Sequence, residues 1–275
     1  MWPFSTTSTI ASSGVLRGAT DWHCHLLPGV DDGIKQIDDT LTLLHRYEEE
    51  GFREVWFTPH VMEDIPNTTE GLRERFATVK AAYEGPLTLH LAAEYMLDNL
   101  FEERLEAGDL LTIGPDHDMV LVETSYFTPP YDLWGLLQRI QSEGYHPVLA
   151  HPERYLYMSN ADYDRLHNMG IRLQLNIPAL GGAYNPESCA RAKRLLRLEY
   201  YSFKGTDTHR IIGFEKALVK AKIEKKYKGR KPIQIEKFKV LLMAEKVKKG
   251  ELTSEKALVK AKIEKSCLKR LSNLQ

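Results

Sequence analysis

Histidines and acidic residues recur in short motifs over the first 210 positions of this 275-residue chain. The first motif, DWHCH at 21–25, places two imidazoles at i and i+2, which point the same way in an extended chain and can bind one ion. Asp207 and His209 repeat that spacing. Each motif alone also fits a structural histidine or a surface charge, so only the combination indicates chemistry. The candidate ligands in these motifs are His23, His25, His60, Glu94, Glu123, His151, Asp207 and His209.

The elements that must position these residues alternate between strands and helices. Helical patterns are clearest over 34–50 and 131–143, and Gly51 and Gly144 follow them where a C-cap is expected. The alternation predicts an α/β fold with a parallel sheet, either closed as a barrel or doubly wound. Apolar runs bounded by turn residues predict strands over 20–23, 54–58, 87–92, 119–123, 147–150, 171–176 and 200–205.

Nearly every candidate ligand directly follows one of these strands. The carboxyl ends of the strands of a parallel barrel meet on one face, so this placement favours the barrel and gathers the motifs into one site. Imidazoles and carboxylates crowded there would be costly without a compensating cation, which predicts a metal cluster. The other histidines lie elsewhere in the predicted elements and are expected to be structural: His45, His90, His117, His146 and His167.

Several function classes lack their sequence signals. There is no Walker loop, no dinucleotide-type glycine fingerprint, and no Cys-x5-Arg phosphate loop. Cys24 lies between two candidate ligands and should point away from them as a buried small hydrophobe. Three separated cysteines do not make a disulfide framework, and the N-terminus lacks a signal-peptide pattern, so a cytoplasmic protein is expected. No apolar run is long enough for a transmembrane helix.

Charge divides the chain sharply. Residues 1–210 hold 18 Lys and Arg against 31 Asp and Glu, whereas residues 211–275 hold 19 against 7. The basic part contains EKALVKAKIEK at 215–225 and again at 255–265, and we expect it to be a helical tail. The tail either binds an acidic partner, an anionic membrane surface or nucleic acid, or consists of solvated helices from a duplication. Residues 1–17 are expected to be a disordered leader, and the acidic body argues against nucleic-acid binding.

The motifs together resemble a known family. DWHCHLLPGVDDG at 21–33, TPHV at 58–61, AAEYML at 92–97, HPERY at 151–155 and GTDTH at 205–209 are similar to motifs of the PHP (polymerase and histidinol phosphatase) superfamily. Within it, they resemble the bacterial manganese-dependent tyrosine phosphatases of capsular and exopolysaccharide synthesis. The resemblance implies a distorted (β/α)7 barrel over residues 18–210 that holds three divalent ions.

The resemblance also implies roles for individual residues. His23, His25, Glu94 and Asp207 would hold one ion, and Glu94 would bridge to a second ion held by Glu123 and His151. Asp32, His60 and His209 would hold the third. Arg154 matches an arginine that contacts the phosphoryl group, and Arg210 stands nearest to a second family arginine. Family members usually carry that second arginine several residues beyond the Asp-x-His motif, but position 214 is Phe here. The basic tail stands where the family has a helix that closes the barrel.

The activity implied is hydrolysis of phosphotyrosine by a metal-activated hydroxide, with Mn²⁺ as the expected ion and Fe or Zn²⁺ as alternatives. The expected substrate is a tyrosine autokinase that controls polysaccharide synthesis. Tyr126, Phe127, Tyr131 and Tyr155 lie near the expected rim, where they would line an entrance for an aromatic ring. Two other hypotheses for the function stay open. The protein could be a PHP phosphoesterase that acts on a small metabolite such as histidinol phosphate, or a catalytically silent metal-binding regulator. The oligomeric state is also open.

Overall fold

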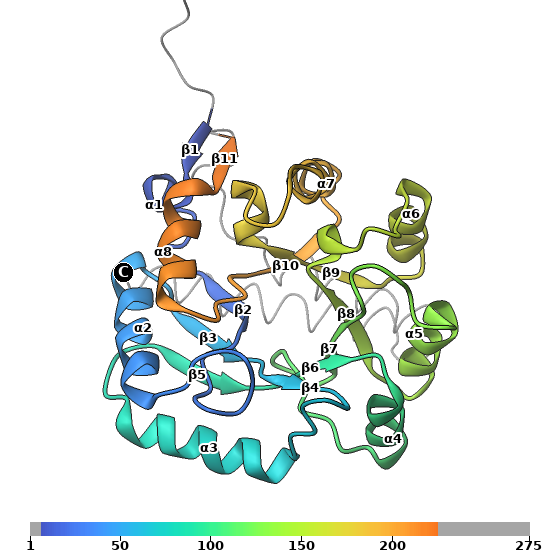
Figure 1. Cartoon of the computed structure of the whole chain (residues 1–275), viewed down its shortest axis with the longest axis horizontal. Helices are drawn as coiled ribbons and strands as arrows, with labels where there is room; N and C mark the ends of the chain where they lie inside the picture. The colour runs from blue at the N-terminus through green and yellow to red at the C-terminus, as the bar shows by residue number, and fades with distance from the viewer. Residues whose placement is uncertain (1–6, 225–275) are drawn as a thin grey trace, which may run out of the picture. The chain divides into compact units, whose positions relative to one another are not determined.

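A computed structural model describes residues 7–224, which belong to one compact unit of the chain. The strands of its two main sheets are all parallel to their neighbours. The larger sheet runs in the order β10-β9-β8-β7-β6-β4 and the smaller in the order β2-β3-β5 (Figure 1). The strands are β2 Thr20–Cys24, β3 Glu54–Phe57, β4 His60–Val61, β5 Thr88–Leu91, β6 Glu94–Met96, β7 Met119–Glu123, β8 His146–Ala150, β9 Arg172–Asn176 and β10 Tyr201–Gly205.

The two sheets adjoin at two places. β2 lies beside the end of β10, because the Asp207 N–H donates to the His23 carbonyl at 2.8 Å and the His25 N–H donates to the Thr208 carbonyl at 3.0 Å. On the opposite side, the chain passes from β3 in the smaller sheet to β4 in the larger one through two residues. The carboxyl ends of strands from both sheets are thereby brought to the same face of the molecule.

Helices lie around the outside of the strands (Figure 1). Each buries one face, as α2 does with Leu43, Leu44 and Tyr47, and this apolar contact with the sheets is the main stabilising interaction. No helix within residues 7–224 has both the length and the apolar character needed to cross a bilayer. The helices are α2 Ile37–Glu50, α3 Thr69–Ala82, α4 Asn99–Ala107, α5 Leu133–Ser142, α6 Asn160–Asn168, α7 Pro186–Arg197 and α8 Ile211–Lys220, with 3-10 turns η1 Pro152–Arg154 and η2 Ile177–Gly181.

All seven predicted strands are present, and each end lies within one residue of its expected position. The predicted helices over 34–50 and 131–143 are present as the shorter α2 and α5. β4 and β6 were not predicted, and they pair with His60 opposite Glu94. Strands of two and three residues have no alternating pattern that a sequence could reveal.

The expectation of a disordered leader over 1–17 is wrong for residues 7–17. They form β1 (Thr7–Thr9) and α1 (Ile10–Ser13), and Ile10 and Leu16 are buried. β1 pairs antiparallel with β11 (Lys222–Glu224), with Thr7 opposite Glu224. The partner of this segment lies more than 200 residues away in the sequence, so local composition could not identify it.

The expectation that the folded domain ends at residue 210 is also wrong. α8 buries Phe214 and Leu218 against the domain, and the Phe214 ring stacks on Tyr47 of α2 at 4.6 Å. The first copy of the repeated segment therefore supplies the second half of α8 and all of β11, rather than a solvated tail. The second copy, at 255–265, lies outside the described residues.

Candidate metal centre

The two histidines of the first motif meet as their spacing predicts. His23 and His25 are fully buried, and their Nε2 atoms lie 3.0 Å apart. Cys24 points the other way and its thiol donates to the Trp56 carbonyl at 3.3 Å, which confirms its interpretation as a buried small side chain. The i, i+2 geometry at the end of β2 thus presents two imidazoles to one point.

Glu94, the first residue of β6, forms the middle of the cluster. Its Oε2 atom lies 3.1 Å from His23 Nε2, 3.3 Å from His25 Nε2 and 3.2 Å from His60 Nδ1. Glu94 is buried, and within residues 7–224 its Oε2 atom has no hydrogen-bond partner. Three nitrogens therefore converge on one carboxylate oxygen at short range without hydrogen-bonding it. A buried charged oxygen in this position is costly unless a cation lies among the converging atoms.

The remaining carboxylates and imidazoles surround this centre. His151 Nε2 lies 3.0 Å from Glu94 Oε1, and Glu123 Oε1 lies 3.1 Å from His60 Nδ1. Asp207 Oδ1 lies 3.3 Å from His25 Nε2. Nine residues from six elements and their adjoining loops thus form one continuous cluster, although up to 186 positions separate them in the chain.

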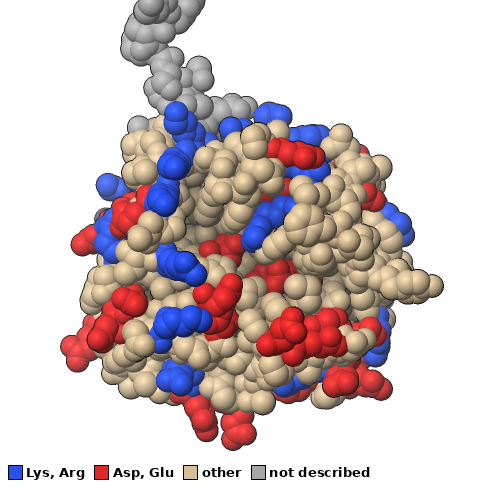
Figure 2. Space-filling view, viewed as in Figure 1, with Lys and Arg blue, Asp and Glu red and all other residues tan. Residues whose placement is uncertain are grey.

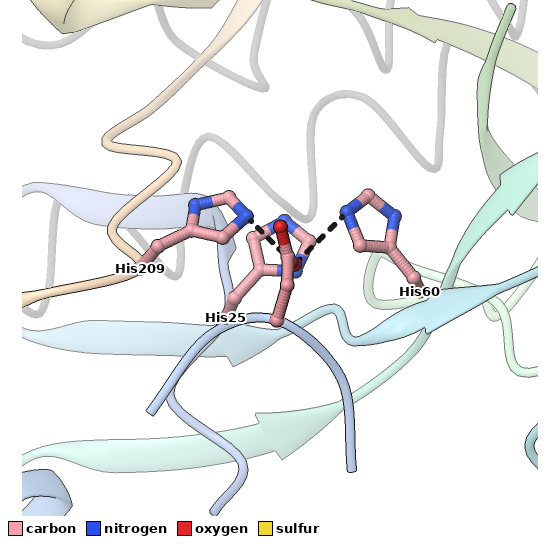
Figure 3. A group of neighbouring side chains, drawn as sticks. His25, His60 and His209 are labelled. Atoms are coloured by element: carbon pink, nitrogen blue, oxygen red, sulfur yellow. Dashed lines mark ion pairs between the residues drawn. The ribbon is translucent and has the colours of Figure 1, made fainter. Parts of the chain in front are cut away.

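One edge of the cluster reaches the surface. Asp32 is 67 % exposed, and its Oδ1 atom lies 3.3 Å from His209 Nε2 and 3.7 Å from His60 Nε2. Figure 3 shows His60 and His209 on either side of His25, each arriving from a different segment. Figure 2 shows a hollow on the face drawn in Figure 1, with acidic side chains inside it and basic ones at its edge.

Four sets of these residues have ligand atoms within 4.8 Å of one another. One of them, His25, Asp32, His60 and His209, contains the three residues expected to hold the third ion. The others overlap through shared residues, and they place His60 with Glu94 and Glu123, whereas the resemblance implied His151 there. His151 is grouped with His23 and Glu94, although its Nε2 is also 3.6 Å from Glu123 Oε2.

The electrostatics of the cluster follow from its burial. Burial alone lowers the pKa of His23, but the carboxylates of Glu94 and Asp207 outweigh it and raise that pKa to about 9. The pKa of Glu94 is held well below its usual value because the surrounding imidazoles outweigh its desolvation. Positive charge is therefore strongly favoured at these atoms, and protons and a metal cation compete for the same lone pairs.

Two further residues orient the first pair of histidines, and sequence reasoning missed both. The buried Asp31 Oδ2 lies 2.8 Å from His25 Nδ1, and the buried Gln174 Oε1 lies 2.8 Å from His23 Nδ1. Acceptors on Nδ1 leave the two Nε2 atoms free to act as ligands. A signal for Gln174 was present, because it alternates with Leu173 and Leu175 and so shares one face of β9 with the polar Arg172 and Asn176.

Arg154 borders the cluster at Asp207. Its Nη1 donates to Asp207 Oδ2 at 3.2 Å, while its guanidinium lies 3.9 Å from the centre of the Tyr126 ring and 4.3 Å from that of Tyr184. Arg210 is instead an exposed residue at the N-cap of α8. Within residues 7–224, the Arg210 guanidinium makes no hydrogen bond or ion pair with the cluster.

The aromatic residues expected at the rim divide into two groups. Phe127 is 73 % exposed and Tyr131 is fully exposed, whereas Tyr155 is fully buried and its hydroxyl donates to the Ala150 carbonyl. The expectation that Tyr155 lines an entrance is therefore wrong. The five histidines set aside all lie outside the cluster, as His45 does in its contact with Glu48 on α2.

Comparison with known proteins identifies the family of this chain. The family described as "Capsular polysaccharide synthesis, CpsB/CapC" matches residues 19–235. The chain belongs to the CpsB/CapC family. The match runs past residue 210 and so includes α8 and β11.

Two curated relatives illustrate the family. The tyrosine-protein phosphatase YwqE of Bacillus subtilis is 26 % identical over 197 residues, covering 70 % of this chain and 77 % of the relative. The tyrosine-protein phosphatase CpsB of Streptococcus pneumoniae is 31 % identical over 164 residues, covering 57 % of this chain and 66 % of the relative. A solved structure from work on YwqE and CpsB, described as "unique metal-dependent tyrosine phosphatases", superposes with a TM-score of 0.66 at 25 % identity. It covers 71 % of this chain and 81 % of the solved chain.

Proposed function

We propose that this protein is a metal-dependent tyrosine phosphatase whose two sheets form a distorted (β/α)7 barrel around the metal cluster. The observation that carries the proposal is the convergence of three imidazole nitrogens on the unpartnered Glu94 Oε2. Hydrogen bonding alone does not account for that arrangement, whereas a bound cation does. Membership of a family whose relatives carry the name tyrosine-protein phosphatase supports the reaction.

The residues present fit a set of divalent ions. Mixed imidazole and carboxylate donors suit Mn²⁺, Fe and Zn²⁺. We propose that each chain binds three Mn²⁺ ions. Such ions lower the pKa of a bound water and neutralise the charge of a phosphoryl group. The proposed ligands are His23, His25, Asp32, His60, Glu94, Glu123, His151, Asp207 and His209.

The chain's own side chains supply orientation around the substrate. Arg154 can offer two parallel N–H donors to the phosphoryl oxygens, a planar contact that suits the charge distributed over that group. Its ion pair with Asp207 supports this role, because it holds those donors next to the cluster. Asp31 and Gln174 hold the histidine rings from behind. We also propose Arg210, which is exposed and directly follows His209, as a second arginine for the phosphoryl group.

We propose a phosphotyrosine protein of capsule or exopolysaccharide synthesis as the substrate, and a tyrosine autokinase as the specific partner. The family's description and the names of the relatives support the class of substrate. The proposal of an autokinase as the partner rests on the resemblance of the motifs at 21–33 and 205–209 to those of the bacterial manganese-dependent tyrosine phosphatases.

The decisive experiment is phosphate release from a phosphotyrosyl peptide by chelator-treated protein, with and without added Mn²⁺. We expect release only with the metal, and little release from histidinol phosphate under the same conditions. Release from histidinol phosphate alone would move the assignment to a metabolite phosphoesterase. Retained metal with no turnover of either substrate would contradict the enzymatic assignment.

Single-site variants test whether the cluster is the metal site. Changing His25 to Ala should reduce bound Mn²⁺ and turnover together, because His25 Nε2 approaches both Glu94 and Asp207. His45→Ala is the matched control, since that imidazole is 62 % exposed on α2. Normal metal content in His25→Ala, measured by elemental analysis after dialysis, would remove His25 from the ligand set.

A further inference from the structure

The guanidinium of Arg154 lies over two aromatic rings. Tyr126 comes from the loop after β7 and Tyr184 from the loop before α7, and their ring centres lie 3.9 and 4.3 Å from the Arg154 Cζ atom. A cation this close to the face of a tyrosine ring is attracted by the negative charge of the π-system. Rings from two separate loops therefore both hold one arginine.

The two tyrosines are themselves fixed by further contacts. Tyr126 packs edge-on against His151 at 5.7 Å between ring centres, and its backbone carbonyl accepts from the Leu156 N–H at 2.8 Å. Tyr184 is 36 % exposed, but its hydroxyl faces inward, accepting from Asn176 Nδ2 at 2.7 Å and donating to Asp207 Oδ2 at 3.3 Å.

Asn176 completes the connection between Tyr184 and the cluster. Its second N–H donates to Asp207 Oδ2 at 2.6 Å, and Arg154 Nη1 reaches the same oxygen at 3.2 Å. Tyr184, Asn176 and Arg154 thus all contact one oxygen of Asp207, while the other oxygen, Oδ1, faces His25. The position of Arg154 is in this way tied to the carboxylate that borders the histidines.

We propose that Tyr126 and Tyr184 are positioning residues that clamp Arg154 and fix the plane in which it meets the phosphoryl group. The inference rests on the proposed function and deepens it. An arginine side chain has many rotamers, and ordering it on binding weakens the interaction unless the protein has already restricted it. Contact with two rings restricts the plane of the guanidinium, and a bidentate contact between its N–H groups and two phosphoryl oxygens requires a defined plane.

The arrangement separates two roles that an aromatic residue near such a site can have. A tyrosine that stacks on the substrate's own ring acts only on aryl substrates. A tyrosine that acts through Arg154 affects every ligand that carries a phosphoryl group, including inorganic phosphate, and has no effect once Arg154 is removed. These two expectations can be measured independently of each other.

The experiment uses the full-length, Mn²⁺-loaded protein with Tyr126→Leu, Tyr184→Leu and the ring-preserving Tyr126→Phe and Tyr184→Phe. Each substitution is made alone and together with Arg154→Ala. Two quantities are measured, kcat/KM for a phosphotyrosyl peptide and the Kd of inorganic phosphate by calorimetry. Tyr200→Leu serves as the control, because Tyr200 stacks on His167 away from the cluster.

We expect each Leu variant to lose about three- to tenfold in kcat/KM and to bind phosphate more weakly by a similar factor, as the removal of one cation–π contact implies. Tyr126→Phe should match the unchanged protein, since the ring alone contacts Arg154. Tyr184→Phe should fall between, because it keeps the ring and loses the hydroxyl contacts with Asn176 and Asp207. In the Arg154→Ala background, Tyr126→Leu should have no further effect. Tyr184→Leu should there lose no more than Tyr184→Phe does, because only the hydroxyl contacts with Asn176 and Asp207 are left to remove.

Three results would overturn the clamp. Leu variants that lower both quantities equally with and without Arg154 would show that the tyrosines act independently of it. A loss confined to the peptide, with phosphate affinity unchanged, would assign them to the substrate's ring. If the unchanged protein does not bind phosphate at all, Arg154 does not contact a phosphoryl group and the tyrosines cannot position it for one. Phosphate affinity remains measurable where peptide turnover is absent, so failure of the clamp and failure of the phosphatase assignment are distinguished.

Discussion

His23 Nε2 and His25 Nε2 lie 3.0 Å apart, and each ring is held from behind by a different residue. Gln174 of β9 contacts His23 Nδ1, and Asp31, six residues beyond His25, contacts His25 Nδ1. The spacing in β2 therefore only aligns the two side chains, while residues from elsewhere select which nitrogen faces the centre. Such outer contacts orient metal ligands and tune their basicity.

Asp31 should affect metal binding without being a ligand itself. Its Oδ2 atom contacts His25 Nδ1 and accepts from the His60 N–H at 3.1 Å, while Oδ1 accepts from the Gly33 N–H at 2.9 Å. Asp31→Asn replaces one of these acceptors with an NH₂ donor, so the three contacts cannot all be kept. We expect affinity for Mn²⁺ to fall about 10- to 100-fold, measured by titration of the metal-free protein.

Asp38→Asn is the control for that substitution, because Asp38 is exposed in the first turn of α2. Equal Mn²⁺ affinity in the Asp31 and Asp38 variants would show that His25 needs no orienting carboxylate.

Truncation should separate the folded part of the basic segment from the rest. Deleting residues 226–275 leaves α8 and β11 in place, so we expect turnover and thermal stability close to those of the full chain. Deleting residues 211–275 removes Phe214 and Leu218 from the core and takes away the partner of β1. Loss of one large core side chain typically costs about 3 to 5 kcal/mol, so this shorter chain should unfold or precipitate.

Circular dichroism melting and peptide turnover compare the two truncations directly. Collapse of the protein that ends at residue 225 would show that residues beyond it support the fold. A stable, active protein ending at residue 210 would show that α8 is dispensable for both.

Lys204 should make stability depend on pH in the alkaline range. Its side chain is buried and Nζ donates to the Val15 carbonyl at 2.9 Å; burial lowers its pKa from 10.5 to about 8. Below pH 8 both folded and unfolded chains carry the charge, and the folded state bears the full desolvation cost. Between pH 8 and 10.5 only the unfolded chain binds the proton, so this contribution to stability increases with pH by up to roughly 3 kcal/mol.

Lys204→Met removes that titration. The free energy of unfolding of the variant relative to the unchanged protein should therefore decline as the pH rises from 8 to 10.5, measured by urea denaturation. Lys193→Met, at an exposed position on α7, supplies the baseline. A constant difference between Lys204→Met and the unchanged protein across this range would show that Lys204 titrates normally.

The sequence by itself determined the seven longer strands and the content of the cluster. Apolar runs bounded by turn residues are local properties, which is why all seven long strands were predicted to within one residue at each end. Ligand-type residues directly after those runs were predicted to meet because strand ends in a parallel fold share one face. The structure brings these residues together around Glu94, whose Oε2 atom has no hydrogen-bond partner within residues 7–224.

Only the tertiary structure decided which residues support that cluster and where the domain ends. Gln174 reaches His23 across 151 positions, and β1 meets β11 only because both ends of the described chain return to the same side. Phe214 stands inside a segment that composition marks as a basic tail, yet it stacks on Tyr47. These contacts depend on the distance between residues remote in sequence, which spacing along the chain does not encode. The sequence therefore specified the candidate ligands, and the fold specified what orients them.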